Sequence, residues 1–434
     1  MSSYRYNFVV LTLDGLLFWL GLAYYSPTTI LPLFVSHLTP SNVVVGAVPA
    51  IVALSWSLPQ LFGAQVLAAL RSGRRARWWG GSRKSFVVRT AAPARIPLLV
   101  LVVATSVLAV SHPTLTLVVF FVCFGLFRGT GGLNTPVYYD LVAVAIHPRA
   151  RARFIGLTQF LGGAIAAVAL ALGRAALDAF PFPGGFVICF AAGLVFVTLG
   201  LFCMASVREP ALVVAGSGPD AEAPPGGGRA PGGILRTAAR ALRAEGALRR
   251  YLGARVFVAL ASMALAFFGV HAARDLGASD GDVALYSAVL LAAQTASALL
   301  WGAVADRFSL TPVLAAAVAL AVAGTGLALL AQTLVAFGAV FALVGASLGA
   351  LAVTDPGMPL ALAEARGADR ALYVAVANTV LAPVYVVAPL IGGGAADTGG
   401  YRLTYALAAA AGAVALPLVA RTRVQAISSG AATS

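Results

Sequence analysis

Long apolar stretches recur along this sequence, and they restrict its possible folds more than any other feature. A helix needs about 20 mostly apolar residues to cross the roughly 30 Å hydrocarbon core of a bilayer. Stretches of that kind occur twelve times, which predicts an all-α integral membrane protein with twelve transmembrane helices. They cover residues 7–35, 43–70, 96–112, 114–145, 154–177, 184–206, 254–274, 283–305, 312–332, 334–362, 371–396 and 402–420.

The small share of charged residues argues against most other classes of protein. Only 10% of the residues are charged and 60% are hydrophobic, whereas soluble globular proteins carry about 25% charged residues. A soluble enzyme, a disordered protein and a fibrous protein are therefore disfavoured. The apolar stretches also exceed the roughly 10-residue strands of a membrane β-barrel. Cys123, Cys189 and Cys203 fall within apolar stretches, so we interpret them as packing residues.

The basic residues predict how the chain is oriented in the membrane. Cytoplasmic loops of membrane proteins are enriched in Lys and Arg. If the N-terminus is cytoplasmic, most of the 29 basic residues fall in predicted inner segments. We therefore expect a bacterial inner-membrane protein with both termini in the cytoplasm. The net charge of +14 reflects this topology and contact with anionic membrane lipids, and we find no nucleic-acid-binding motif. The residues assigned to inner segments include Arg83, Lys84, Arg89, Arg95 and Arg255.

A change of composition near the middle divides the sequence into two halves. Residues 207–252 comprise a Gly- and Pro-rich linker and a basic amphipathic segment, which we expect to lie on the inner membrane surface. The flanking domains are residues 1–206 and 253–434, with six predicted helices each. An offset of 220 positions aligns Gly125 with Gly345, Gly129 with Gly349, and Pro136 with Pro356. Related halves of this kind normally place a substrate site between them, near the bilayer midplane.

Three motifs resemble those of the major facilitator superfamily of secondary transporters. The segment Gly302–Arg307 (GAVADR) matches the GxxADR loop motif of that family. Arg128–Gly132 (RGTGG) resembles the RxxxG motif of its proton-coupled members, and Ala388–Arg402 resembles the usual end of the eleventh helix. The stretch Tyr24–Pro32 (YYSPTTILP) also resembles a poorly characterised bacterial branch of the family.

The resemblance implies two pseudo-symmetric six-helix bundles and a gating role for Gly302, Asp306 and Arg307. Two features depart from the family's pattern. The first-half copy of the loop motif lacks its acidic residue between positions 63 and 71, and the fifth stretch lacks the proline of the antiporter motif. The first departure weakens the case for gating by that loop, and the second weakens the case for drug efflux.

Of the charged residues in the predicted transmembrane helices, three lie well away from the helix ends, where an ionisable group needs a partner or a wet cavity. They are Asp14, Arg128 and Asp355. In the fold that the resemblance implies, the helices of Asp14 and Arg128 line one cavity, so we expect these two residues to pair. We assign all three to proton coupling. The alternatives are a structural ion pair for Asp14 and Arg128, and a simply hydrated carboxylate for Asp355.

Neutral polar and aromatic residues within the predicted helices are candidates for binding a substrate. Amides can bind a solute or bridge two helices, and aromatic rings can stack on a solute or pack in the protein. We find no metal-ligand spacing and expect neither a metal nor a cofactor. The candidate substrate-binding residues are Trp19, Tyr25, Asn134, Tyr138, Gln159, Gln294, Asn378 and Tyr385.

These features together predict a secondary active transporter that moves a small organic solute by alternating access, coupled to protons and favouring efflux. Its expected partners are a small-molecule substrate, protons and membrane lipids, and we expect a monomer. An uncoupled facilitator or uptake permease and a transport-inactive sensor on the same fold remain as alternatives. An integral membrane enzyme would need clustered His, Asp or Glu residues, which the sequence does not suggest.

Overall fold

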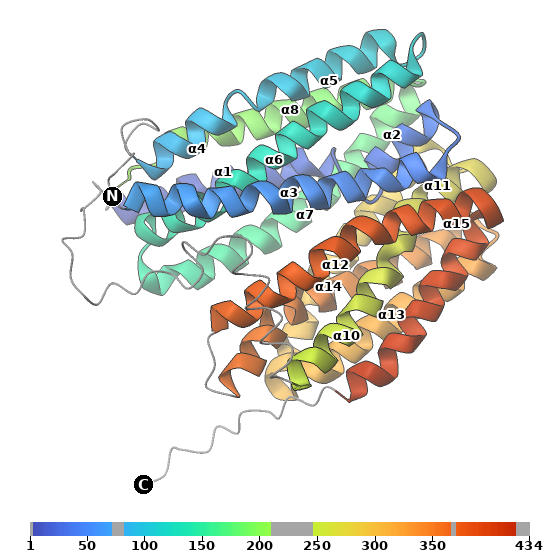
Figure 1. Ribbon diagram of the computed structural model, residues 1–434. Coiled ribbons are helices and arrows are strands. Elements are labelled where there is room, and N and C mark those ends of the chain that lie inside the picture. The colour runs from blue at the N-terminus through green and yellow to red at the C-terminus, as the bar shows by residue number, and fades with distance from the viewer. Residues whose placement is uncertain (1–2, 72–81, 210–245, 366–369, 422–434) are drawn as a thin grey trace. The chain divides into compact units, whose positions relative to one another are not determined.

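The computed structural model describes residues 3–71, 82–209, 246–365 and 370–421, and every regular element in these ranges is a helix (Figure 1). The predicted linker and most of the amphipathic segment lie outside the described residues. In chain order the helices are α1 (Ser3–Ala23), α2 (Ile30–Leu38), α3 (Asn42–Arg71), α4 (Arg83–Ala91), α5 (Arg95–Leu108), α6 (Pro113–Ala145), η1 (Pro148–Ala150), α7 (Arg151–Ala179), α8 (Gly184–Ala205), α10 (Gly246–Ala261), η2 (Ser262–Ala264), α11 (Leu265–Asp275), α12 (Asp280–Arg307), α13 (Leu310–Leu330), α14 (Leu334–Glu364) and α15 (Arg370–Ala420).

The described residues contain 11 helical segments that are long and apolar enough to cross a membrane. The last of them lies in α15, which is 51 residues long and contains Gly400 at φ 71° and ψ 177°. Glycine tolerates this backbone conformation because it has no Cβ, and the helix breaks there into two. α15 therefore supplies two crossings, which gives the predicted total of twelve and confirms an all-α, multi-pass membrane protein.

The helices group into two compact units that differ from the two halves of the sequence. Unit 1 comprises Met1–Ala223 together with Leu265–Leu291, and unit 2 comprises Pro224–Ala264 together with Ala292–Ser434. Unit 1 thus includes α11 and the first part of α12, because α11 packs against α2 and α3. This arrangement positions α11, from the second half of the sequence, beside α2 and α3 of the first half.

The start of α4 corrects the predicted beginning of the third transmembrane segment. The sequence predicted that segment from residue 96, but the helix already begins at Arg83. The carboxylate of Glu209 accepts hydrogen bonds from the backbone N–H groups of Arg83 (3.1 Å) and Lys84 (2.9 Å). A carboxylate stabilises a helix N-terminus, where backbone N–H groups lack helical partners. The predicted boundary at residue 96 was therefore wrong, and the four basic residues Arg83, Lys84, Arg89 and Arg95 lie in α4 or α5.

An aromatic core fills unit 1 around α2. Phe34 is fully buried and packs against Phe120, Phe186 and Phe190, with ring centroids 5.1 to 5.9 Å apart. Tyr25 stacks on Phe190 at 5.4 Å. Aromatic pairs at such distances add stability beyond the area that they bury. In contrast, large apolar side chains such as Val335 (86% exposed) face outward, as a surface surrounded by lipid requires.

Two glycines of the proposed repeat occupy matching packing positions. Gly129 of α6 lies against Ser55 of α3, and Gly349 of α14 lies against Ser297 of α12. In both cases the fourth transmembrane segment of its half approaches the second at a glycine. A Cβ on Gly349 would overlap the Ser297 hydroxyl, so the helices can pack this closely only with a small residue there.

Candidate functional site

An ion pair with a buried arginine connects helices of unit 2. The Arg255 Nη2 atom of α10 lies 2.7 Å from Oδ1 of Asp355 in α14, and it donates a 2.9 Å hydrogen bond to the Tyr385 hydroxyl of α15. Asp355 and Tyr385 were predicted from the sequence as site residues, in different roles. Their partner Arg255 was counted with an inner segment and was not predicted as a site residue; it lies in α10 and is 1% exposed.

The two members of this pair differ in their access to the surroundings. The side chain of Asp355 is 42% exposed, whereas that of Arg255 is 1% exposed. The Nε and Nη1 atoms of Arg255 are buried and have no hydrogen-bond partner. Asp355 therefore supplies the negative charge that compensates a buried guanidinium, and it is also the member of the pair that a proton or a solute can reach.

The sequence around each residue explains the local structure. Arg255 follows Leu252 and Ala254 in an apolar cluster that also contains Met358, one turn beyond Asp355. Pro356 and Pro359 both lie inside α14. Because proline has no N–H, the backbone carbonyl of Asp355 lacks its helical donor four residues later, at Pro359. Asp355 is therefore located where α14 has lost a backbone hydrogen bond.

The predicted pair between Asp14 and Arg128 is not formed. Arg128 instead lies over the ring of Trp56, with its Cζ 4.6 Å from the ring centroid. Arg95 donates hydrogen bonds to the carbonyls of Ala91 and Val197, both at 2.8 Å. The contact of Arg128 with Trp56 thus takes the place of the expected ion pair.

The substrate-binding candidates of unit 1 differ in accessibility. Tyr25 is 1% exposed, and its hydroxyl donates to the Phe190 carbonyl at 2.6 Å, so it serves packing in this structure. Asn134 is 8% exposed, and its side-chain oxygen accepts a 2.7 Å hydrogen bond from Thr90. In this structure the amide therefore bridges α6 to α4, which is the alternative to binding a solute. Tyr138 is partly buried beside Tyr139. Trp19 is 38% exposed, and Gln159 is also exposed.

The remaining predicted site residues, including the gating residues, lie in unit 2. Asn378 is exposed, and Gln294 and Tyr385 are partly buried. At the end of α12, Asp306 and Arg307 are exposed and Gly302 is partly buried. The guanidinium of Arg307 lies 5.7 Å from the ring centroid of Phe308. The roles of these residues in substrate binding and gating stay predictions.

The contacts of Arg255 and Arg95 are what sequence reasoning missed. Both were only counted with inner segments, because basic side chains usually mark the cytoplasmic side. A signal for Arg255 was present, since the residue lies within the predicted apolar stretch 254–274. Within the described ranges, no group of three or more His, Cys, Asp or Glu side chains is arranged to hold a metal ion.

Comparisons with known proteins agree with the fold described above. Residues 251–431 match the family model described as Major Facilitator Superfamily, and no curated protein matches the sequence. Among solved structures, a point mutant of the nucleoside transporter NupG is similar with a TM-score of 0.69 and 11% identity, over 96% of this chain and 99% of that one.

Two transporters from E. coli also have folds similar to that of this chain. The xylose transporter XylE has a TM-score of 0.60 and 17% identity, over 97% of this chain and 99% of that chain. A point mutant of the fucose:proton symporter FucP has a TM-score of 0.56 and 13% identity, over 97% and 99%. Residues 251–431 thus carry the sequence pattern of the major facilitator superfamily, and the chain shares along its length the fold of these transporters.

Proposed function

We propose that this protein is a proton-coupled secondary transporter that moves a small organic solute by alternating access. The observation that carries the proposal is the ion pair of Arg255 and Asp355, whose atoms lie 2.7 Å apart. A buried, uncompensated charge within a membrane-spanning helix is costly. The pair therefore gives a protonation event at Asp355 a direct effect on how α10 and α14 pack.

Protonation of Asp355 removes the charge that compensates Arg255. The guanidinium then keeps its hydrogen bond to Tyr385 but has lost its opposite charge. Removing one partner of a buried ion pair costs about 3–5 kcal/mol, and exposure of Asp355 reduces this figure. A cost of even ~1.4 kcal/mol changes the ratio of two conformations about tenfold. Proton binding at this site is therefore strong enough to drive a conformational change.

The solute is proposed by class only. The similar structures include transporters named for nucleosides, xylose and fucose, which supports a small organic solute. The few charged residues in the transmembrane helices favour a neutral or weakly polar one. Trp19, Gln159 and Asn378 are the accessible candidates for contacting it, and we propose export as its direction.

The test uses purified protein in liposomes that contain a pH-sensitive dye. Uridine, xylose and fucose are the first solutes, followed by a metabolite and antibiotic library preselected by thermal shift, because a bound solute raises the melting temperature. An active solute should move protons together with itself. Asp355→Asn should abolish proton movement and gradient-driven transport, while Glu364→Gln, which removes another acid of α14, should retain both.

Other outcomes would select one of the alternatives. Solute transport that is unaffected by a pH gradient and by Asp355→Asn would indicate an uncoupled facilitator. Solute binding without transport in either direction would indicate a sensor. We also propose a monomer in the bacterial inner membrane with cytoplasmic termini, and a C-terminal tag that antibodies reach on intact cells would contradict that orientation.

A further inference from the structure

Arg128 of α6 is a cation of unit 1 that the ion pair of unit 2 leaves unexplained. Its predicted pair with Asp14 is not formed, and its guanidinium lies over the ring of Trp56 in α3. Among the described residues, Arg128 forms no hydrogen bond and no ion pair. Its Nε atom is buried without a partner, whereas the residue as a whole is partly exposed. The guanidinium is therefore a reachable group with unused donors.

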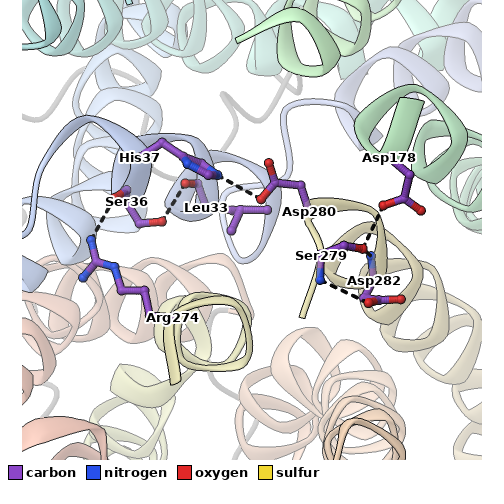
Figure 2. Close-up of polar contacts among 8 residues, drawn as sticks. All are labelled: Leu33, Ser36, His37, Asp178, Arg274, Ser279, Asp280 and Asp282. Atoms are coloured by element: carbon purple, nitrogen blue, oxygen red, sulfur yellow. Dashed lines mark hydrogen bonds and ion pairs between the residues drawn. The ribbon is translucent and has the colours of Figure 1, made fainter. Parts of the chain in front are cut away.

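Other partly buried arginines of unit 1 use their donors. Each of them donates to a carboxylate or to a backbone carbonyl, namely Arg83, Arg95, Arg151 and Arg174. Even Arg274, which is exposed at the end of α11, donates a 2.8 Å hydrogen bond to the Ser36 carbonyl near the end of α2 (Figure 2). Arg128 differs from these arginines because the described part of the chain offers it no acceptor.

The contact with Trp56 does not fully compensate this cation. A cation–π contact stabilises an arginine by less than the cost of placing one near the centre of a membrane-spanning helix. The indole ring also offers no oxygen to the five N–H donors of the guanidinium. A ligand that brings a negatively charged oxygen to these donors would supply both the missing charge and the missing hydrogen bonds.

Two glycines of α6 fix the position of Trp56 beside Arg128. A Cβ on Gly131 would lie 2.8 Å from Cζ3 of the Trp56 ring, and a Cβ on Gly132 would overlap the Trp56 carbonyl oxygen. The ring and the backbone of α3 can approach α6 this closely only because both positions lack a side chain. The segment Arg128–Gly132 (RGTGG) therefore provides the cation together with the space for the ring on which it lies.

The depth of Arg128 favours a solute over a lipid as the source of the anion. Helix α6 runs from residue 113 to residue 145, so Arg128 is 15 residues from its start and 17 from its end. At 1.5 Å per residue, each end of the helix is more than about 20 Å away along the axis. Lipid phosphates lie outside the roughly 30 Å hydrocarbon core, and they therefore lie far from a residue at the middle of the helix.

The single charge of Arg128 favours a carboxylate over a phosphate. A phosphate monoester carries a charge of about −1.5 to −2 at neutral pH, which one guanidinium does not neutralise. A carboxylate carries one negative charge, and its two oxygens match the planar guanidinium with two parallel hydrogen bonds. The ligand that fits is therefore an organic molecule with one carboxylate.

We propose that Arg128 and Trp56 form a binding site for the carboxylate of an organic monoanion. The proposal rests on the proposed function, because it names the class of the transported solute. The remainder of that solute is apolar or weakly polar, in keeping with the few charged residues of the transmembrane helices. Arg128 compensates its one negative charge, and Trp56 orients the guanidinium.

The experiment compares pairs of ligands that differ in charge but hardly in shape. The pairs are benzoate and benzamide, octanoate and octanamide, and indole-3-acetate and indole-3-acetamide. Binding to the purified protein in detergent is measured by thermal shift and titration calorimetry, because a bound ligand raises the melting temperature. The carboxylates should raise it and the amides should not. Inorganic phosphate and phosphatidylglycerol test the two other sources of an anion.

Substitutions connect this binding to the two residues of the site. Arg128→Met should raise the Kd of a carboxylate at least about tenfold. Gly131→Ala should raise it several-fold, because the added Cβ displaces the Trp56 ring. The matched controls are Arg89→Met, an exposed arginine of α4, and Gly156→Ala, where an added Cβ meets nothing within 4 Å. Both controls should keep the parental Kd.

A second measurement separates loss of the site from loss of the fold. Without ligand, Arg128→Met should melt no lower than the parental protein, because it removes a cation that has no partner. A much lower melting temperature would show that Arg128 already has a stabilising partner, and it would overturn the proposal.

The binding results can overturn the proposal in two further ways. Carboxylates that bind no better than their amides, or that bind Arg128→Met as well as the parental protein, would contradict the site. Tighter Arg128-dependent binding of phosphate or phosphatidylglycerol than of every carboxylate would contradict the ligand class. A carboxylate that binds through Arg128 but does not cross liposome membranes would support the site and contradict the proposed function. A solute that is carried with protons and binds independently of Arg128 would do the opposite.

Discussion

The ion pair of Arg255 and Asp355 predicts unequal effects when either partner is removed. Asp355→Ala leaves the guanidinium of Arg255, which is 1% exposed, without its opposite charge. Arg255→Met replaces the cation with an apolar side chain of comparable length and leaves a carboxylate that is 42% exposed. We therefore expect Asp355→Ala to destabilise the protein more than Arg255→Met does.

The magnitude follows from the burial of each partner. Removing one partner of a fully buried pair costs about 3–5 kcal/mol, and partial exposure of Asp355 reduces this to roughly 2 kcal/mol, because exposed pairs contribute little. Arg255→Met should cost about 1 kcal/mol or less, since the remaining carboxylate can be hydrated. The double variant Arg255→Met/Asp355→Ala should resemble Arg255→Met alone, because no uncompensated buried charge remains.

Thermal unfolding in detergent measures this order. A loss of ~2 kcal/mol lowers the melting temperature of a large domain by about 4 °C. Asp355→Ala should therefore melt several degrees below both Arg255→Met and the double variant. Equal or reversed effects, or a double variant that melts at the sum of the two single shifts, would refute the assignment of Arg255 as the buried, charge-dependent partner.

Three further predictions concern packing and backbone geometry. Tyr25→Phe removes the 2.6 Å hydrogen bond to Phe190. It should lower the free energy of unfolding by about 1 kcal/mol without changing solute transport, as measured by melting and liposome assays. Impaired transport at normal stability would instead support a role of Tyr25 in substrate binding. Gly349→Ala creates an overlap between α14 and α12 and should cost about 1–3 kcal/mol, whereas the control Gly326→Ala should leave the melting temperature unchanged. Gly400→Ala places a side chain at φ 71° and should lower the free energy of unfolding by about 1–2 kcal/mol, measured by thermal unfolding. An unaltered melting temperature would contradict a fixed break in α15.

The fold class was accessible from sequence because the lipid bilayer imposes a simple rule. A membrane-spanning segment must satisfy its own backbone hydrogen bonds, so long apolar stretches become helices whatever their neighbours are. The break near Gly400 followed from the separation of the last two apolar stretches. The family resemblance of Gly302–Arg307 depended on local spacing, which is equally readable from sequence.

The partners of the charged residues were not accessible in the same way. Counting basic residues placed Arg95 and Arg255 in inner segments, but charge alone does not indicate whether a side chain has an acceptor in a neighbouring helix. Asp14 was matched to Arg128, which lies over the ring of Trp56 instead. That contact depends on how α3 and α6 pack, which no local pattern encodes.

The sequence by itself determined that this chain is a twelve-span membrane protein, since hydrophobicity and length are properties of each segment alone. The tertiary structure decided that Asp355 meets Arg255 and Tyr385, and that Arg274 and Asp178 cap helix ends more than 100 residues away in the chain. Hydrogen bonds and ion pairs act over about 3 Å, so they depend on the packing of distant helices rather than on spacing along the chain.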